Sequence, residues 1–137
     1  MLSFKIRLVA AVGAAFLVSA FMLPASSAMA TGQSCATSGG PFYTCSYVNG
    51  TGLHINYMQG SVLNQRTSTW TNVHIELSGP RGLIQNCART NISGSQTIYC
   101  RWSPNANEPA GNYCVDAWRL SSGTYVNMGH ACLAVHS

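Results

Sequence analysis

Six cysteines constrain the fold of this 137-residue chain more than any other feature of its sequence. An even number of cysteines in a short exported chain predicts a framework of three disulfides. Such bonds matter most in a domain of about 100 residues, whose hydrophobic core is small. No C-x-x-C spacing is present, so the sequence does not indicate a zinc or redox site. The six are Cys35, Cys45, Cys87, Cys100, Cys114 and Cys132.

The spacing of the cysteines favours one pairing among the fifteen that six cysteines allow. When neighbours along the chain are paired, the midpoint of each pair falls in a turn-prone sequence. Cysteines placed symmetrically about a hairpin turn lie opposite each other, at a distance that a disulfide can span. We therefore favour Cys35–Cys45, Cys87–Cys100 and Cys114–Cys132. A bond between two sheets, such as Cys45 to Cys114, is the main alternative.

Residues 1–30 have the pattern of a secretory signal peptide. Lys5 and Arg7 precede an apolar run, and a site of small residues ends at Ala30. A retained membrane anchor is the alternative, although no second long apolar run follows in the sequence. We expect residues 31–137 to form one secreted, extracellular and monomeric domain that is not inserted in a membrane.

The exported part has a low charge. It contains five arginines, three acidic residues and no lysine, so its formal net charge is +2. A small, dispersed charge does not make the basic stripe that follows a phosphate backbone, so nucleic acid is not an expected partner. No cofactor-binding motif is present, and we expect no cofactor and no metal.

Short alternating segments separated by turn residues predict an all-β fold. The clearest alternation covers residues 69–78, where Val73, Ile75 and Leu77 point one way and His74 and Glu76 point towards water. Seven to nine such strands, with no helical period among them, predict an antiparallel β-sandwich. A small closed β-barrel is the alternative.

Turn signals divide the strands into hairpins. Asn49-Gly50 predicts a tight turn, and residues 60–68 are expected to form a loop with a short edge strand at most. Two further hairpins are predicted, with strands at 83–90 and 96–102 around Ser93-Gly94, and at 112–120 and 125–135 around Ser122-Gly123-Thr124.

The segment Ala110-Gly111-Asn112-Tyr113-Cys114, followed by Trp118, resembles the penultimate strand of immunoglobulin-like domains. In that family a tyrosine at the corner of this strand precedes a core cysteine by two residues. Here the two are adjacent and must face opposite ways. The resemblance therefore implies the architecture only. In style, the chain also resembles small disulfide-stapled secreted proteins of soil bacteria, which are poor in lysine.

Few residues are candidates for catalysis. The three-residue turn at 122–124 places Cys114 opposite Cys132, Asp116 opposite His130 and Trp118 opposite Met128. An aspartate beside a histidine can orient a general base, but a structural pair beside a disulfide is the favoured interpretation. Small secreted ribonucleases use a set of glutamate, histidine and arginine residues. The same residue types are available here in His74 and Glu76, together with His54, His130 and an arginine.

Aromatic residues and one loop are candidates for binding. Trp102 and Trp118 are assigned to the core, whereas Trp70 is a candidate platform for a sugar or a protein. Residues 103–111 form a loop between Cys100 and Cys114 that a protease or amylase inhibitor would present to its target. We expect a non-catalytic binding protein for a protein, carbohydrate or cell-envelope ligand, with a hydrolase inhibitor and a small hydrolase or ribonuclease as alternatives.

Overall fold

The computed structural model describes residues 31–37 and 41–137, so the predicted signal peptide lies outside the described residues. These residues contain ten strands and no helix, and hence no helix that could cross a membrane. The strands are β1 (Gly32–Ala36), β2 (Phe42–Thr51), β3 (His54–Asn64), β4 (Trp70–Gly79), β5 (Gly82–Asn86), β6 (Thr90–Ile92), β7 (Thr97–Trp102), β8 (Ala106–Asn107), β9 (Gly111–Ser121) and β10 (Thr124–Val135).

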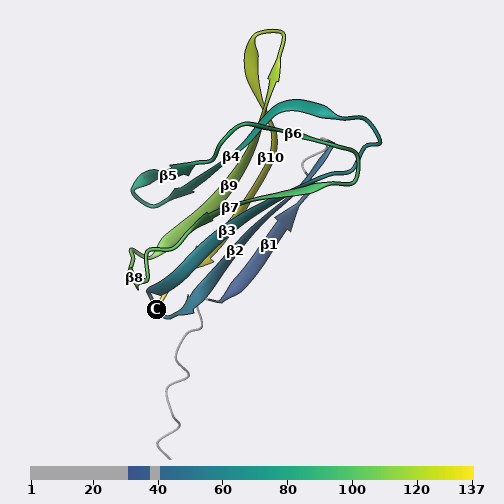
Figure 1. Cartoon of the computed structure of the whole chain (residues 1–137). Coiled ribbons are helices and arrows are strands. Elements are labelled where there is room, and N and C mark those ends of the chain that lie inside the picture. The colour runs from purple at the N-terminus through teal and green to yellow at the C-terminus, as the bar shows by residue number, and fades with distance from the viewer. Residues whose placement is uncertain (1–30, 38–40) are drawn as a thin grey trace, which may run out of the picture.

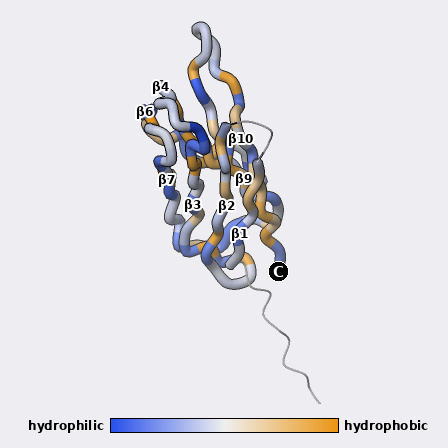
Figure 2. Tube along the Cα trace, turned by 90° about the vertical axis from the view of Figure 1, so that its right-hand side faces the viewer, coloured by the Kyte–Doolittle hydropathy of each residue, from blue (hydrophilic) through white to orange (hydrophobic). Residues whose placement is uncertain are grey.

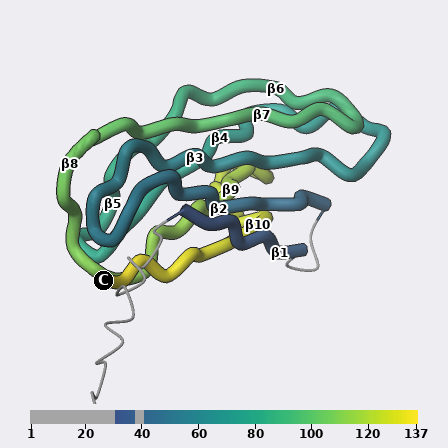
Figure 3. The backbone as a smooth tube through the Cα atoms, turned by 90° about the horizontal axis from the view of Figure 1, so that it is seen from below, coloured from purple at the N-terminus to yellow at the C-terminus, as the bar shows by residue number. Residues whose placement is uncertain are grey.

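The strands form two separate antiparallel sheets that pack face to face (Figure 1), and not a closed barrel. Sheet A has the order β1-β2-β3-β7, and β8 also pairs with β3. Sheet B has the order β10-β9-β4-β5, and β6 also pairs with β4. The chain passes between the sheets three times, and Figure 3 shows the return from β6 to β7 at one end of the molecule.

Alternating side chains from both sheets fill the core between them. Val73, Ile75 and Leu77 of β4 are at most 1% exposed, as their alternation predicted. Figure 2 shows the apolar residues interspersed with hydrophilic ones along the strands, which is the pattern of a sheet with one dry and one wet face. The core therefore separates the two outer faces, and both outer faces lie at the surface of the molecule, where they could bind a ligand.

Two of the turn predictions for β2 and β3 are wrong. Asn49-Gly50 is not a turn: the register shifts there in a β-bulge, and the chain turns at Gly52 and Leu53, where Gly52 has a positive φ of 56°. The bulge changes which residues of β3 face the core, so Met58, Gly60 and Val62 are buried and Tyr57 points outwards. As a result β3 continues to Asn64, through residues that were expected to be a loop.

All six cysteines form disulfides, Cys35–Cys45, Cys87–Cys100 and Cys114–Cys132, which is the pairing that the sequence favoured. The expected reason is wrong for one of them. Residues 83–90 and 96–102 do not form a hairpin, because β5 lies in sheet B and β7 in sheet A. Cys87–Cys100 therefore joins the two sheets, whereas the other two disulfides join paired strands.

The last hairpin projects beyond the rest of the molecule (Figure 1, Figure 2) and differs from the prediction at its tip. Its turn has two residues, Ser122 and Gly123, both with positive φ, so Trp118 lies opposite Asn127 and not Met128. A bulge between Asn127 and Gly129 then restores the register. Because the two changes cancel, Cys114 still faces Cys132 and Asp116 still faces His130.

Candidate functional site

The outer face of sheet B brings together four of the five polar residues that the sequence singled out. Glu76 of β4 lies opposite Asp116 of β9, which lies opposite His130 of β10. His74 lies opposite Trp118 in the next row of the same sheet. Residues directly opposite each other in antiparallel strands share a face, so these side chains form one polar patch.

His54 is not part of this patch. It begins β3 in sheet A, and its ring nitrogens lie 3.3 Å from Asn105 Oδ1 and 3.3 Å from Asn107 Oδ1. The ribonuclease set that included His54 is therefore not assembled.

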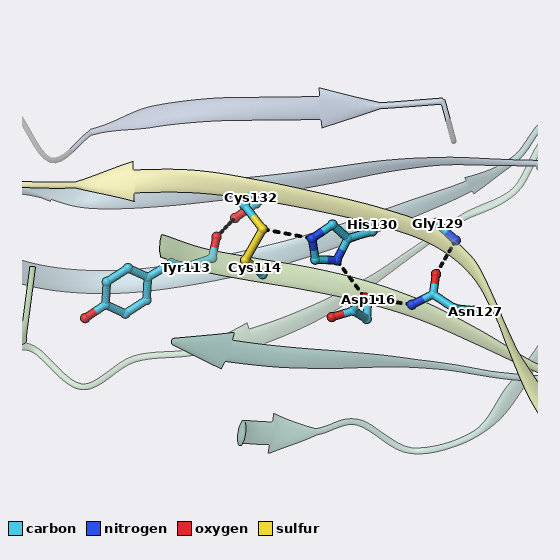
Figure 4. A network of polar contacts seen from close by, with 8 residues as sticks. Tyr113, Cys114, Asp116, Asn127, Gly129, His130 and Cys132 are labelled. Atoms are coloured by element: carbon cyan, nitrogen blue, oxygen red, sulfur yellow. Dashed lines mark hydrogen bonds and ion pairs between the residues drawn. A yellow bond between two sulfur atoms is a disulfide. The ribbon is translucent and has the colours of Figure 1, made fainter. Parts of the chain in front are cut away.

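The Asp116–His130 pair belongs to a network that holds the bulge of β10 (Figure 4). Asp116 Oδ1 accepts hydrogen bonds from His130 Nδ1 and from Asn127 Nδ2, both at 2.7 Å. Asn127 Oδ1 in turn accepts one from the backbone N–H of Gly129, inside the bulge. The aspartate is thus occupied by groups that fix the local backbone, which supports the structural interpretation of this pair.

A cluster of Cys114, Cys132 and His130 lies next to this network. The ligand atoms of these three residues are within 4.8 Å of one another, and His130 Nε2 lies 3.0 Å from Cys132 Sγ. The two sulfurs are bonded to each other, whereas a metal needs the free thiolates. The cluster is therefore a disulfide with a neighbouring imidazole, and not a metal centre.

A shallow hollow of about 280 Å³, which we call the His74 pocket, opens on the same face of sheet B, around His74 and Glu76. His74 was expected to face water but is only 4% exposed, because Tyr125 packs edge-on against its ring at a centroid distance of 4.7 Å. Trp118 was assigned to the core but lies half-buried on this outer face. The pocket is lined by His74, Glu76, Asn86, Arg89, Trp118 and Tyr125.

The contacts of the pocket favour binding over proton transfer. Glu76 Oε1 accepts a hydrogen bond from Asn86 Nδ2 at 2.9 Å and lies 3.5 Å from His74 Nε2. Arg89 places its guanidinium 5.1 Å from the centre of the Tyr125 ring. The lining of the pocket includes no serine, threonine or cysteine that His74 could activate as a nucleophile.

A second hollow, of about 240 Å³, lies at the end of the sandwich between Ile84, Trp102 and Tyr113. Its charged residues, Arg81 and Glu108, lie 3.7 Å apart and compensate each other. This hollow is largely apolar and offers few polar groups that could orient a ligand.

Trp70, the predicted platform, is only partly accessible. The Arg119 guanidinium lies 3.7 Å from the centre of its ring, and Phe42 packs against it in an edge-to-face contact at 5.5 Å. A sugar that stacked on Trp70 would have to displace Arg119.

The loop at 103–111 is held against β3. Within it, β8 pairs with His54 and Ile55, and the Glu108 N–H donates to the Leu53 carbonyl. An inhibitor would present the backbone of this loop to its target, but part of that backbone is already hydrogen-bonded to the start of β3 and to Leu53.

The outer face of sheet A carries a feature that the sequence analysis missed. Four of the six tyrosines point outwards from it, and Tyr99 and Tyr43 are 64% and 37% exposed. The Tyr47 and Tyr57 rings lie 5.7 Å apart, and the Arg101 guanidinium lies 3.6 Å from the centre of the Tyr57 ring. A hydrogen bond with Tyr47 is the main cause that raises the pKa of Tyr57. We call this surface, made of Tyr43, Tyr47, Tyr57, Tyr99, Gln59 and Arg101, the tyrosine face.

A period-of-two pattern in the sequence points to part of this face. Tyr43 and Tyr47 lie four positions apart in one strand, and Tyr99 and Arg101 lie two positions apart in another, so each pair shares a face. The contribution of Tyr57 has no such signal, because it depends on the bulge at Asn49-Gly50. The pocket residues Asn86, Arg89 and Tyr125 come from segments whose proximity the sequence does not indicate.

Comparisons of the chain with family models, with curated proteins and with solved structures found no match.

Proposed function

We propose that the protein is a secreted, non-catalytic carbohydrate-binding protein that holds an extended glycan on the tyrosine face. The observation that carries this proposal is the gathering of four tyrosines on the outer face of one sheet. Aromatic rings provide flat platforms with a polar edge, and the hydroxyl, amide and guanidinium groups around them can pair with sugar hydroxyls.

The composition of the face favours a glycan over a protein partner. Leu63 is its one aliphatic side chain in the register of β2, β3 and β7, whereas the centre of a protein interface is usually apolar. The three acidic residues of the chain lie elsewhere, and Arg101 is the one charged residue on the face. A neutral or weakly anionic glycan matches this chemistry, and nucleic acid does not, because a single cation cannot follow a phosphate backbone.

We further propose that the architecture is immunoglobulin-like. The orders β2-β3-β7 and β10-β9-β4-β5 correspond to the A-B-E and G-F-C-C′ orders of that fold, with β1 as an added edge strand. Tyr113, at the start of β9, donates a hydrogen bond from its hydroxyl to the Pro109 carbonyl at 2.8 Å, as a tyrosine corner does. Cys114 departs from the family, because it bonds within sheet B to Cys132.

Secretion is part of this proposal. Three disulfides form and persist in an oxidising compartment, in agreement with a signal peptide at residues 1–30. An extracellular location would also place the tyrosine face in contact with cell-wall and environmental polysaccharides.

Retention on insoluble polysaccharides tests the function. The protein is mixed with cellulose, chitin or purified bacterial cell wall, and the bound fraction is measured against protein concentration. We expect Tyr99→Ala and Tyr43→Ala each to weaken retention at least about tenfold, since aromatic anchors at a binding surface cost about 1.4 kcal/mol or more when truncated. The control is Leu83→Ala, an exposed apolar residue on sheet B. Retention that survives both tyrosine truncations, or retention on none of the three materials, would overturn the proposal.

A further inference from the structure

The His74 pocket contains buried polar atoms that the fold itself leaves without partners. His74 Nδ1 and Trp118 Nε1 are both buried, and neither has a hydrogen-bond partner among residues 31–37 and 41–137. A buried polar group without a partner destabilises the fold, because it has lost its hydrogen bonds to water without gaining others. His74 and Trp118 lie opposite each other on β4 and β9. Apolar side chains at these two positions would be equally compatible with the backbone pairing of the sheet. Two of the four such atoms in the described residues therefore lie in this one pocket, which makes it the candidate for a ligand that pairs with them.

The chemistry of the two atoms defines the group that would satisfy them. Trp118 Nε1 carries a hydrogen and can only donate. Glu76 Oε1 lies 3.5 Å from His74 Nε2, and a neutral His74 ring with its proton on Nε2 would present Nδ1 as an acceptor. A hydroxyl group accepts a hydrogen bond and donates one, so the hydroxyl groups of one ligand can serve both atoms.

The rest of the pocket fits a neutral polyhydroxylated ring. Glu76 and Arg89 carry opposite charges, so the lining favours neither a net anion nor a net cation. Glu76 Oε2 has no polar contact within the described part of the chain and can accept from ligand hydroxyls, while Asn86 and Arg89 can donate. Tyr125 and Trp118 provide aromatic walls for the apolar face of a sugar. The volume of about 280 Å³ lies at the small end of ligand sites and suits one ring.

We infer that the His74 pocket binds a single neutral sugar ring, such as the terminal unit of a glycan, with Tyr125 moving aside from His74 as the ring enters. The pocket lies on sheet B and the tyrosine face on sheet A, so the two sites are separate. This inference does not depend on the tyrosine face.

Nuclear magnetic resonance of the indole N–H groups tests the inference. The methyl glycosides of glucose, galactose, mannose and N-acetylglucosamine are added in turn to ¹⁵N-labelled protein, and Trp118→Phe assigns the Trp118 signal. We expect at least one sugar to shift the Trp118 indole signal while those of Trp70 and Trp102 stay in place.

Matched variants identify the contacts. Glu76→Gln is expected to weaken the sugar affinity at least tenfold, and Glu108→Gln, a carboxylate outside the pocket, is expected to leave it unchanged. Arg89→Gln alters an exposed side chain and provides a second test if Glu76→Gln does not fold. A Trp118 signal that none of the four sugars moves, or an affinity that neither variant lowers, would overturn the inference. Both results are independent of retention on insoluble polysaccharide, so the two proposals can fail separately.

Discussion

Gly60, in the middle of β3, is a point at which the two sheets approach each other closely, with no side chain of its own between them. A Cβ atom at this position would lie 2.8 Å from Val115 Cγ1, 2.9 Å from Leu77 Cδ2 and 3.1 Å from Ile75 Cγ2. Distances below 3.0 Å are shorter than real carbon contacts, so these core side chains would have to move. Gly60→Ala therefore tests whether the sheets pack as closely as the structure has them.

The expected loss of stability is the difference of two effects. Adding a methyl group to a filled core costs about 1–3 kcal/mol. Replacing glycine lowers the entropy of the unfolded chain and returns about 0.4–1 kcal/mol where the backbone conformation is allowed. We expect Gly60→Ala to lower the free energy of unfolding by about 1–2 kcal/mol, or the Tm by roughly 4–16 °C for a domain of this size.

Urea denaturation followed by tryptophan fluorescence measures this change. The control is Gly32→Ala on the edge strand β1, where the added methyl would meet Leu133 at an ordinary 3.4 Å and should be neutral or slightly stabilising. Val115→Ala removes the nearest obstacle, so the double variant Gly60→Ala/Val115→Ala should be less destabilised than the sum of the single variants by about 0.5 kcal/mol or more. A Gly60→Ala protein as stable as the unchanged protein, or strict additivity in the double variant, would refute the close packing.

Two further predictions concern the bond between the sheets and the corner of β9. Replacing Cys87 and Cys100 together by alanine should lower the free energy of unfolding by about 3 kcal/mol, because their disulfide closes a loop with a sequence separation of 13; a loss below about 1 kcal/mol in urea denaturation would contradict this. Tyr113→Phe should cost about 0.5–1.5 kcal/mol through the lost bond to the Pro109 carbonyl. Burial raises the pKa of Tyr113 above its ordinary 10.0, so the folded state favours the neutral phenol. The stability that this preference gives is fully present below pH 10 and is lost as the pH rises through the raised pKa. The Tm of Tyr113→Phe should therefore fall less above pH 10 than the Tm of the unchanged protein.

Local patterns in the sequence account for much of the construction. The alternation of Val73, Ile75 and Leu77 determines which side of β4 enters the core, because side chains in a strand point to opposite faces in turn. The spacing of Cys114 and Cys132 about a short turn brings them together, and two adjacent deviations in that hairpin cancel. These features depend on residues close in sequence, so short-range rules suffice to predict them.

Long-range packing decided the remainder. Asn49-Gly50 forms a bulge and not a turn because β2 and β3 extend beyond it, and this bulge directs Tyr57 to the outer face of sheet A. Cys87 reaches Cys100 across two sheets, although the same pairing was expected within one hairpin. His74 was expected in water but is buried beneath Tyr125, which comes from a distant strand.

The sequence by itself thus determined an all-β, disulfide-bonded domain and the faces of its most regular strands, since alternation and cysteine spacing are local properties. Only the tertiary structure decided which polar and aromatic residues share a surface, because strand order and the crossing between sheets depend on contacts between distant segments. The tyrosine face and the His74 pocket belong to this second category. Each is built from three or more strands or segments whose neighbours in space are far apart in the chain.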